Sequence, residues 1–182
     1  ALELLLRRLQ KSILIDKIIV ATSTNSEDDQ LFELVINLGF DCFRGSEKNV
    51  LERYVQAIKS SPARTIVRIT GDCPLIDPDL VDKVISCYES ENAKYASNVN
   101  PPSFPDGMDV EVIDRATLES LLIKPLDKSD LEHVTSSLQN DKKLAKANLR
   151  SPKDLSQIRI TLDENEDLAV ISKIVKPVSY TH

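Results

Sequence analysis

Apolar residues recur along this chain at two spacings, one typical of helices and one typical of strands. Leu2, Leu5 and Leu9 share one helical face, which predicts a helix over residues 1–12. A short β-branched run at residues 65–69 predicts a buried strand. Applied to the whole chain, the same spacings predict helices at 1–12, 26–38, 49–60, 77–89, 114–123, 129–139 and 164–175, and strands at 17–21, 40–43, 65–69, 94–98, 108–113, 145–149 and 158–161.

The order of these segments predicts an α/β fold with a mainly parallel sheet flanked by helices, because strands and helices largely alternate. The late strands at 145–149 and 158–161 are hairpin-like, which predicts one antiparallel strand or a small excursion from the sheet. A length of 182 residues fits one domain. We expect this domain to cover residues 1–175, with a non-native or disordered tail at 176–182, where the preceding pattern stops.

Composition and charge narrow the classes of partner. A net charge of -6 argues against binding to a nucleic-acid backbone, which requires a basic surface. No apolar run approaches the ~20 residues of a membrane span, and no signal peptide is recognisable, so we expect a cytoplasmic protein without a membrane partner. Cys42, Cys73 and Cys87 lack metal-ligand spacing and are expected to be reduced thiols. The helical faces could support a homodimer.

Two aspartates follow predicted strands. Asp72 comes directly after the strand at 65–69, and ligands of open α/β sheets bind beyond the carboxyl ends of strands. Asp163 closes the strand that begins at residue 158. If the two carboxylates meet at one edge of the sheet, they suit Mg²⁺. The alternatives are that Asp72 stabilises its own turn and that Asp163 forms a capping box with Glu166.

Further polar residues gather in two places. Asp106, Asp109 and Glu111 lie around Gly107, and Glu132 and His133 lie early in a predicted helix. Asp109 and Glu111 are spaced to share one face of a strand. The alternatives are a common Asp-Gly turn, a solvated strand face and a surface helix. Arg44 and Arg53 could equally be surface charges.

Seven motifs occur along the chain in a fixed order. They are LIDKIIVATSTN (14–25), FRGS (43–46) with VLERY (50–54), RITGDCPLIDP (68–78), SNV (97–99), FPDGMDVEV (104–112), LEHVT (131–135) and RITLD (159–163) with EDL (166–168). In this order the chain resembles the cytidylyltransferases of the spore-coat polysaccharide type, which are relatives of the acylneuraminate and 3-deoxy-manno-octulosonate cytidylyltransferases. The resemblance extends to about residue 175.

The resemblance implies a nucleotide-diphospho-sugar transferase fold and a reaction. A hydroxyl of a sugar or sugar acid attacks the α-phosphate of CTP and releases pyrophosphate, in the synthesis of surface-polysaccharide precursors. Asp72 and Asp163 match the aspartates that hold Mg²⁺ and support catalysis. The residues that match the nucleotide side are Ala21, Thr22, Ser23, Arg44, Ser46, Arg53 and Gly71. The residues that match the sugar side are Asp106, Gly107, Asp109, Glu111, Glu132 and His133.

The chain departs from the family at its beginning. Family members start with an apolar strand and a loop of Gly, Arg and Lys that grips the triphosphate, whereas Ala1 already precedes a predicted helix. The resemblance therefore implies that strand and loop are missing here, that one sheet edge is unpaired, and that this chain by itself is poorly active. The alternative function is a non-catalytic domain that binds a nucleotide-sugar or assists assembly.

Overall fold

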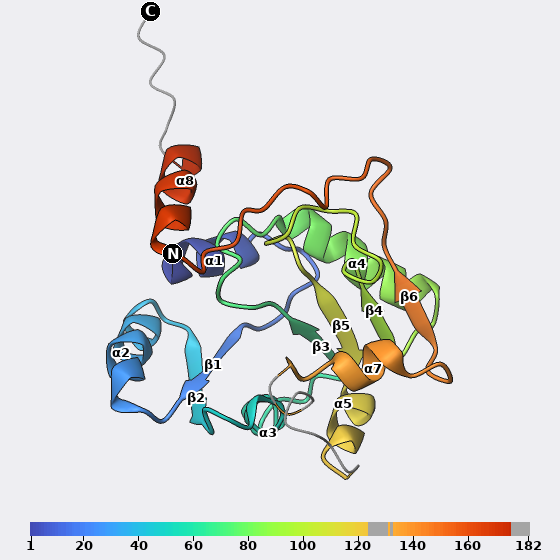
Figure 1. The fold of residues 1–182 in the computed structure, drawn as a ribbon. Helices are drawn as coiled ribbons and strands as arrows, with labels where there is room; N and C mark the ends of the chain where they lie inside the picture. Colours follow the sequence, from blue (N-terminus) through green and yellow to red (C-terminus); the bar gives the residue numbers. More distant parts are fainter. Residues whose placement is uncertain (124–130, 132, 176–182) are drawn as a thin grey trace, which may run out of the picture.

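The computed structural model describes residues 1–123, 131 and 133–175, which form helices around two β-sheets (Figure 1). The helices are α1 (Leu2–Leu9), the 3₁₀ helix η1 (Ser26–Asp28), α2 (Asp29–Asn37), α3 (Val50–Ala57), α4 (Pro78–Ser90), α5 (Arg115–Leu121), α7 (Ser136–Asn140) and α8 (Asn165–Val175). The strands are β1 (Ile19–Ser23), β2 (Asp41–Gly45), β3 (Thr65–Arg68), β4 (Tyr95–Ser97), β5 (Glu111–Asp114) and β6 (Lys146–Asn148). None of the described helices is both long and apolar enough to span a membrane.

The strands pair in two groups. β1 and β2 form a parallel pair, and the other four strands form a sheet in the order β3-β5-β4-β6. β5 runs antiparallel to both of its neighbours, and β4 and β6 run parallel to each other. The predicted α/β class is therefore confirmed, with β3, β4 and β6 pointing the same way.

The place of the antiparallel strand was predicted wrongly. It is β5, and the late segment that forms β6 joins the sheet in parallel. β5 follows β4 without an intervening helix, and a parallel pair would require a crossover connection. The predicted strand at 158–161 is also wrong, because this segment contributes only an isolated bridge between Asp106 and Arg159.

Three predicted helix starts are confirmed by their capping bonds. The side chain of Asn49 accepts from the Glu52 amide, and Asp77 and Asp114 cap α4 and α5 in the same manner. The predicted helix at 26–38 divides into η1 and α2, and Asn25, which precedes η1, makes no side-chain cap. Each confirmed cap satisfies a helix amide that would otherwise have no partner.

The predicted helix at 129–139 is only partly realised. Residues 129, 130 and 132 lie outside the described residues, so no comparison is possible for them. Val134 has a φ of 63°, which right-handed helical residues do not adopt, and α7 begins two residues later at Ser136. This break directs the residues before α7 toward the carboxyl end of β3, where the site described below lies.

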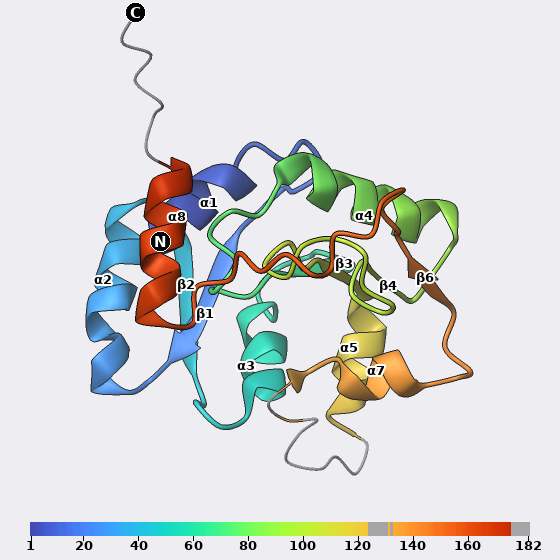
Figure 2. The same ribbon diagram turned by 45° about the horizontal axis from the view of Figure 1, so that its top comes forward.

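Helices cover both faces of the four-stranded sheet (Figure 2). Alternating strand residues divide between two apolar clusters, since Ala96 and Val112 pack with α4 and α1, whereas Tyr95 and Ile113 pack with α3, α5 and α7. A third cluster, around Val35, joins α2 to α1 and β2. The strands are therefore held from both sides, and their carboxyl ends are rigid supports for the loops that follow.

The turn at Asp106 and Gly107 lies directly against the segment before α8. The Asp106 amide donates to the Ile158 carbonyl, and the Ile160 amide donates to the Asp106 carbonyl. Gly107 has a φ of 98°, and a Cβ at this position would lie 2.8 Å from the Ile160 carbonyl carbon. Only glycine fits this contact without strain, so the turn and the segment are fixed together.

We predict that Gly107→Ala destabilises the protein by about 2 kcal/mol or more. Alanine is strained at this positive φ, and its Cβ would also clash with the backbone of Ile160. Urea unfolding followed by circular dichroism measures the effect. Gly71→Ala is the matched control: a Cβ there meets no atom within 4 Å, and its effect should stay within about 0.5 kcal/mol. Equal effects of the two substitutions would contradict the packing described here.

Candidate active site at the carboxyl ends of the strands

Asp72 lies in a turn two residues beyond the Thr70 that follows β3. The Cys73 amide donates to the Thr70 carbonyl and closes this turn through the backbone. Within the described part of the chain, the Asp72 carboxylate accepts only a long contact from the Cys73 thiol, at 3.8 Å. The alternative that Asp72 serves to stabilise its own turn therefore finds no supporting backbone bond, and the carboxylate remains open to a ligand.

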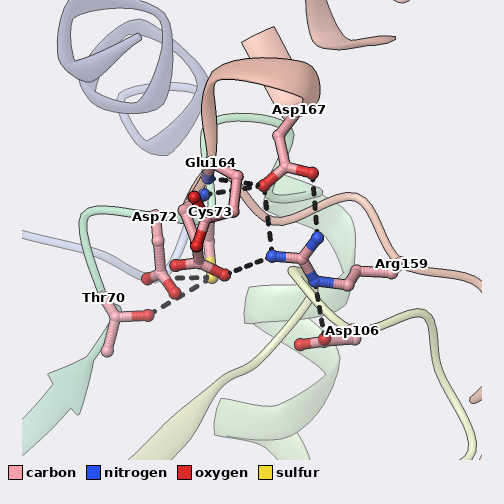
Figure 3. A network of polar contacts seen from close by, with 8 residues as sticks. Thr70, Asp72, Cys73, Asp106, Arg159, Glu164 and Asp167 are labelled. Carbon is pink, nitrogen blue, oxygen red and sulfur yellow. Dashed lines mark hydrogen bonds and ion pairs between the residues drawn. The ribbon is translucent and has the colours of Figure 1, made fainter.

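Asp163 is brought beside this turn by one backbone hydrogen bond. The Leu162 amide donates to the Asp72 carbonyl at 2.8 Å, so the residue before Asp163 is attached to Asp72 itself. The Asp163 side chain accepts from Nη2 of Arg159 at 2.6 Å. Figure 3 shows Arg159 and Asp72 on the two sides of this region. The structure thus brings the two predicted aspartates to one place at the carboxyl end of β3.

The predicted capping box of Asp163 with Glu166 is wrong. Asp167 caps the start of α8 instead, because its Oδ2 accepts from the amides of both Asp163 and Glu164, each at 2.9 Å. These bonds hold the pKa of the Asp167 carboxyl below its usual range. The turn that carries Asp163 therefore does not depend on the Asp163 side chain.

The residues present fit a hard divalent cation. Two carboxylates are the number that Mg²⁺ commonly takes from a protein, with water and phosphate oxygens in its other positions. Burial raises the pKa of the neighbouring Cys73 thiol to about 12, so sulfur stays protonated and is not a competing ligand. Among residues 1–123, 131 and 133–175, no group of three or more His, Cys, Asp or Glu side chains forms a chelating cluster.

The loop after β1 is organised by Asp28. Its Oδ2 accepts from the Thr22 hydroxyl at 2.7 Å and from the Ser23 amide at 2.9 Å. Hydrogen bonds from Ser23, then from Thr22, lower the pKa of the Asp28 carboxyl. The last three residues of β1 are Ala21, Thr22 and Ser23. They lie at the carboxyl end of the β1–β2 pair, and the loop that follows them is fixed.

Arg44 and Arg53 hold loops rather than lying loose at the surface. The Arg44 guanidinium donates to the carbonyls of Ser23 (2.9 Å) and Asn25 (2.8 Å), and it pairs with Asp29 at 2.7 Å. Arg53 donates to the Ser46 carbonyl at 2.9 Å. Both guanidinium groups are therefore bonded to loop carbonyls, through contacts that are partly exposed to solvent.

A polar cavity of about 270 Å³ lies at the carboxyl end of β3, where Thr70, two residues before Asp72, lines it together with residues of β5 and of the segment around α7. Among the side chains that line it are Arg68, Thr70, Asp109, Glu111, His133 and Gln139. The structure thus brings together three of the residues assigned to the sugar side, Asp109, Glu111 and His133. Arg68 and Gln139 were missed, because nothing in their local sequence distinguishes them from other strand and helix residues.

Asp106 and Gly107, which were also assigned to the sugar side, lie elsewhere. Asp106 faces Arg159, at 3.8 Å, and Gly107 contacts the backbone of Ile160. Glu132 lies outside the described residues. Asp106 and Gly107 therefore support the segment that carries Asp163 instead of lining the cavity.

Glu111 is buried in the wall of this cavity, with 3% of its surface exposed. One of its oxygens accepts from the Arg68 guanidinium, and the other accepts from the Tyr95 hydroxyl and from Nε2 of Gln139. Burial, followed by the nearby Glu111 charge, raises the pKa of Tyr95, so the phenol stays a donor. The alternative of a solvated strand face is wrong, and the network holds one wall of the cavity in a single arrangement.

Asp109 is the carboxylate of this cavity that can change charge near neutral pH. Burial, followed by the nearby charges of Asp106, Glu111 and Asp72, raises its pKa to about 6. Arg68 opposes this shift but is already paired with Glu111. A partly protonated Asp109 can donate as well as accept a hydrogen bond, which suits contact with a hydroxyl group.

A larger cavity, of about 380 Å³, lies at the opposite end of the β1–β2 pair. Lys17 and Asp41 line it, and both lie where these strands begin. Ligands of open α/β sheets bind at the carboxyl ends of the strands. We therefore assign the candidate site to the smaller cavity, at the carboxyl end of β3.

Comparisons with known proteins agree on one protein family. Residues 2–171 match the family model described as Cytidylyltransferase. The chain is 38% identical over 178 residues to an uncharacterised protein of Methanocaldococcus jannaschii, covering 96% of this chain and 72% of that protein. It is 33% identical over 181 residues to the spore coat polysaccharide biosynthesis protein SpsF of Bacillus subtilis, covering 95% and 74%.

A solved structure supports the fold directly. A cytidylyltransferase from Leptospira borgpetersenii aligns with a TM-score of 0.88 and 30% identity, covering 93% of this chain and 73% of that one. The expected nucleotide-diphospho-sugar transferase fold is therefore confirmed.

We predict that Asp109→Asn stabilises the protein at pH 7. The folded state binds the Asp109 proton up to about pH 6, whereas the unfolded chain releases it near pH 3.9. Wild-type stability from this group is present below pH 4 and is lost as the pH rises through 6. The neutral amide avoids the loss, so the variant should gain about 1 kcal/mol at pH 7, after allowance for partial exposure.

Urea unfolding at several pH values between 4 and 7.5 measures this difference. The stabilities of the variant and wild type should converge near pH 4. A difference that is constant across the range would show that Asp109 does not titrate as described.

Proposed function

We propose, since this chain belongs to the cytidylyltransferase family, that it transfers CMP from CTP to a hydroxyl of a sugar or sugar acid and releases pyrophosphate. The observation that carries the proposal is the position of Asp72. It lies at the carboxyl end of β3, two residues beyond Thr70, which lines a polar cavity, and it is attached through Leu162 to the turn that carries Asp163. A nucleotidyl transferase needs a phosphate-binding centre next to an acceptor pocket, and this arrangement supports the proposal.

In this proposal, Asp72 and Asp163 hold Mg²⁺. When bound, Mg²⁺ neutralises phosphate charge and orients the α-phosphate for in-line attack. Asp167, which binds the amides of Asp163 and Glu164, sets the position of the turn that carries the Asp163 carboxylate. The chain itself contributes mainly positioning and charge, which account for most of the catalysis of phosphoryl and nucleotidyl transfer.

The acceptor would occupy the cavity lined by Asp109 and His133. Glu111 is locked by Arg68, Tyr95 and Gln139, so this wall would present the same groups to each acceptor. Asp109, with its pKa raised to about 6, would bind the acceptor hydroxyl that faces Asp72. Hydroxyl, amide and carboxylate groups of this kind suit a polyhydroxylated acceptor.

The nucleotide would lie at the carboxyl ends of β1 and β2. Ser23 at the end of β1 and the loop that follows it are fixed by Asp28 and Arg44, so backbone groups there can bind the base and ribose. Ser46 and Arg53 would line the nucleotide-binding region on the side of β2, and the backbone at Gly71 would lie beside the phosphates. The SpsF relative is named for spore coat polysaccharide biosynthesis, which supports a role in making surface-polysaccharide precursors.

We predict that Asp72→Asn and Asp163→Asn each lower kcat by at least ~100-fold, because each removes a charge that would face the phosphates. The assay measures pyrophosphate released from CTP and Mg²⁺, with a panel of neutral sugars and sugar acids. The assay uses the full-length protein that the gene encodes. Asp154→Asn, which changes an exposed aspartate bonded to Ser156, is the matched control and should stay within twofold.

Two results would contradict this proposal. CTP binding without pyrophosphate release, with every acceptor, would favour the alternative of a non-catalytic nucleotide-sugar-binding domain. Unchanged turnover in Asp163→Asn, with only a loss of about 1 kcal/mol in stability, would reduce Asp163 to a structural residue.

A further inference from the structure

Arg159 is the cation within a group of carboxylates that come from two segments (Figure 3). Its Nη1 and Nη2 donate to the two oxygens of Asp167, at 2.8 and 3.1 Å. Its Nη2 also donates to Asp163 at 2.6 Å, and its Nε lies 3.8 Å from Asp106. Asp163 therefore shares its cation with a second, better-bound carboxylate.

The two close pairs of Arg159 differ in strength. Asp167 engages two guanidinium nitrogens, and its side chain is 15% exposed. Asp163 engages one nitrogen, and its side chain is 48% exposed. Bidentate pairs are the stronger kind, whereas an exposed single pair contributes at most about 1 kcal/mol. The pair between Arg159 and Asp163 is consequently the one that opens at low cost.

The backbone at Asp163 is held independently of this pair. Asp167 binds the amides of Asp163 and Glu164, and the Leu162 amide is bonded to the Asp72 carbonyl. The Asp163 carboxylate can therefore change its partner by rotation of its own side chain. Neither the turn nor α8 has to move.

We propose that Arg159 regulates the divalent-cation site: it holds the Asp163 carboxylate in the metal-free protein and releases it to the cation, while it stays paired with Asp167. This inference rests on the proposed function, because it takes Asp163 as a ligand of the cation. It goes further by giving Arg159 a competing role that acts against metal binding.

The charge of Arg159 has a definite consequence for affinity. A divalent cation at Asp163 must replace one existing ion pair and approach a guanidinium that remains nearby. Removing the positive charge should therefore tighten binding, by about 3- to 10-fold for an interaction in largely exposed surroundings. If Arg159 were only a structural clamp for the turn, its removal would weaken binding. The two roles thus differ in the sign of the effect.

The test measures the Kd of Mn²⁺ without nucleotide, by electron paramagnetic resonance of the unbound ion. Arg159→Gln is expected to bind Mn²⁺ about 3- to 10-fold more tightly than wild type. Arg159→Lys, which keeps the charge, should stay within twofold. Lys17→Gln is the matched control, because it removes an equally exposed positive charge, paired with Asp41, at the opposite end of the strands. It too should stay within twofold.

A double variant tests whether the effect passes through Asp163. In the Asp163→Asn background, Arg159→Gln should change the Kd by less than twofold, because the carboxylate for which Arg159 and the cation compete is gone. Thermal unfolding checks that each variant folds. Arg159→Met, which keeps the apolar stem, repeats the measurement if Arg159→Gln does not fold.

Three outcomes would overturn the inference: an equal or weaker affinity in Arg159→Gln, a tightening that persists without Asp163, or no Mn²⁺ binding to the wild type. The proposed function is tested separately. If Arg159→Gln binds Mn²⁺ more tightly but the wild type shows no CTP turnover with any acceptor, nucleotidyl transfer is refuted and the role of Arg159 is supported. If the wild type turns over CTP but Arg159→Gln binds Mn²⁺ with unchanged affinity, the proposed function is supported and the role of Arg159 is refuted.

Discussion

The hydrogen bond from the Leu162 amide to the Asp72 carbonyl is the contact on which the site depends. It joins the turn after β3 to the segment before α8, and these segments are far apart in the sequence. The bonds of Asp106 with Ile158 and Ile160 extend the same junction to a third loop. Because backbone groups make these contacts, they fix the loops and leave the aspartate side chains available for ligands.

Charge is distributed unequally around this junction. Glu111 is buried and bonded to Arg68, Tyr95 and Gln139, so its charge is compensated within the protein. Asp109 is half-buried among other carboxylates, and its raised pKa shows that its charged form is disfavoured. A folded protein retains such a destabilising group where function requires it, and compensates for the loss elsewhere.

Much of the fold follows from local sequence patterns. The caps at Asn49, Asp77 and Asp114 depend on bonds within four residues, so the sequence predicts them correctly. The capping of α8 is local as well, but Asp167 supplies it instead of Asp163. Two failures have the opposite property. The antiparallel direction of β5 and the break at Val134 depend on what each segment meets after folding. Periodicity contains no information about such distant neighbours.

The sequence by itself determined the α/β class, the family resemblance and the strand-end position of Asp72, because spacing, capping chemistry and ordered motifs are local properties. It also placed Asp109 and Glu111 on one face, and both line the same cavity. Only the tertiary structure decided that Arg68 and Gln139 compensate Glu111, and that Arg159 pairs with Asp163. The physical reason is that burial and Coulomb interactions depend on distances in space, which residue order along the chain does not specify.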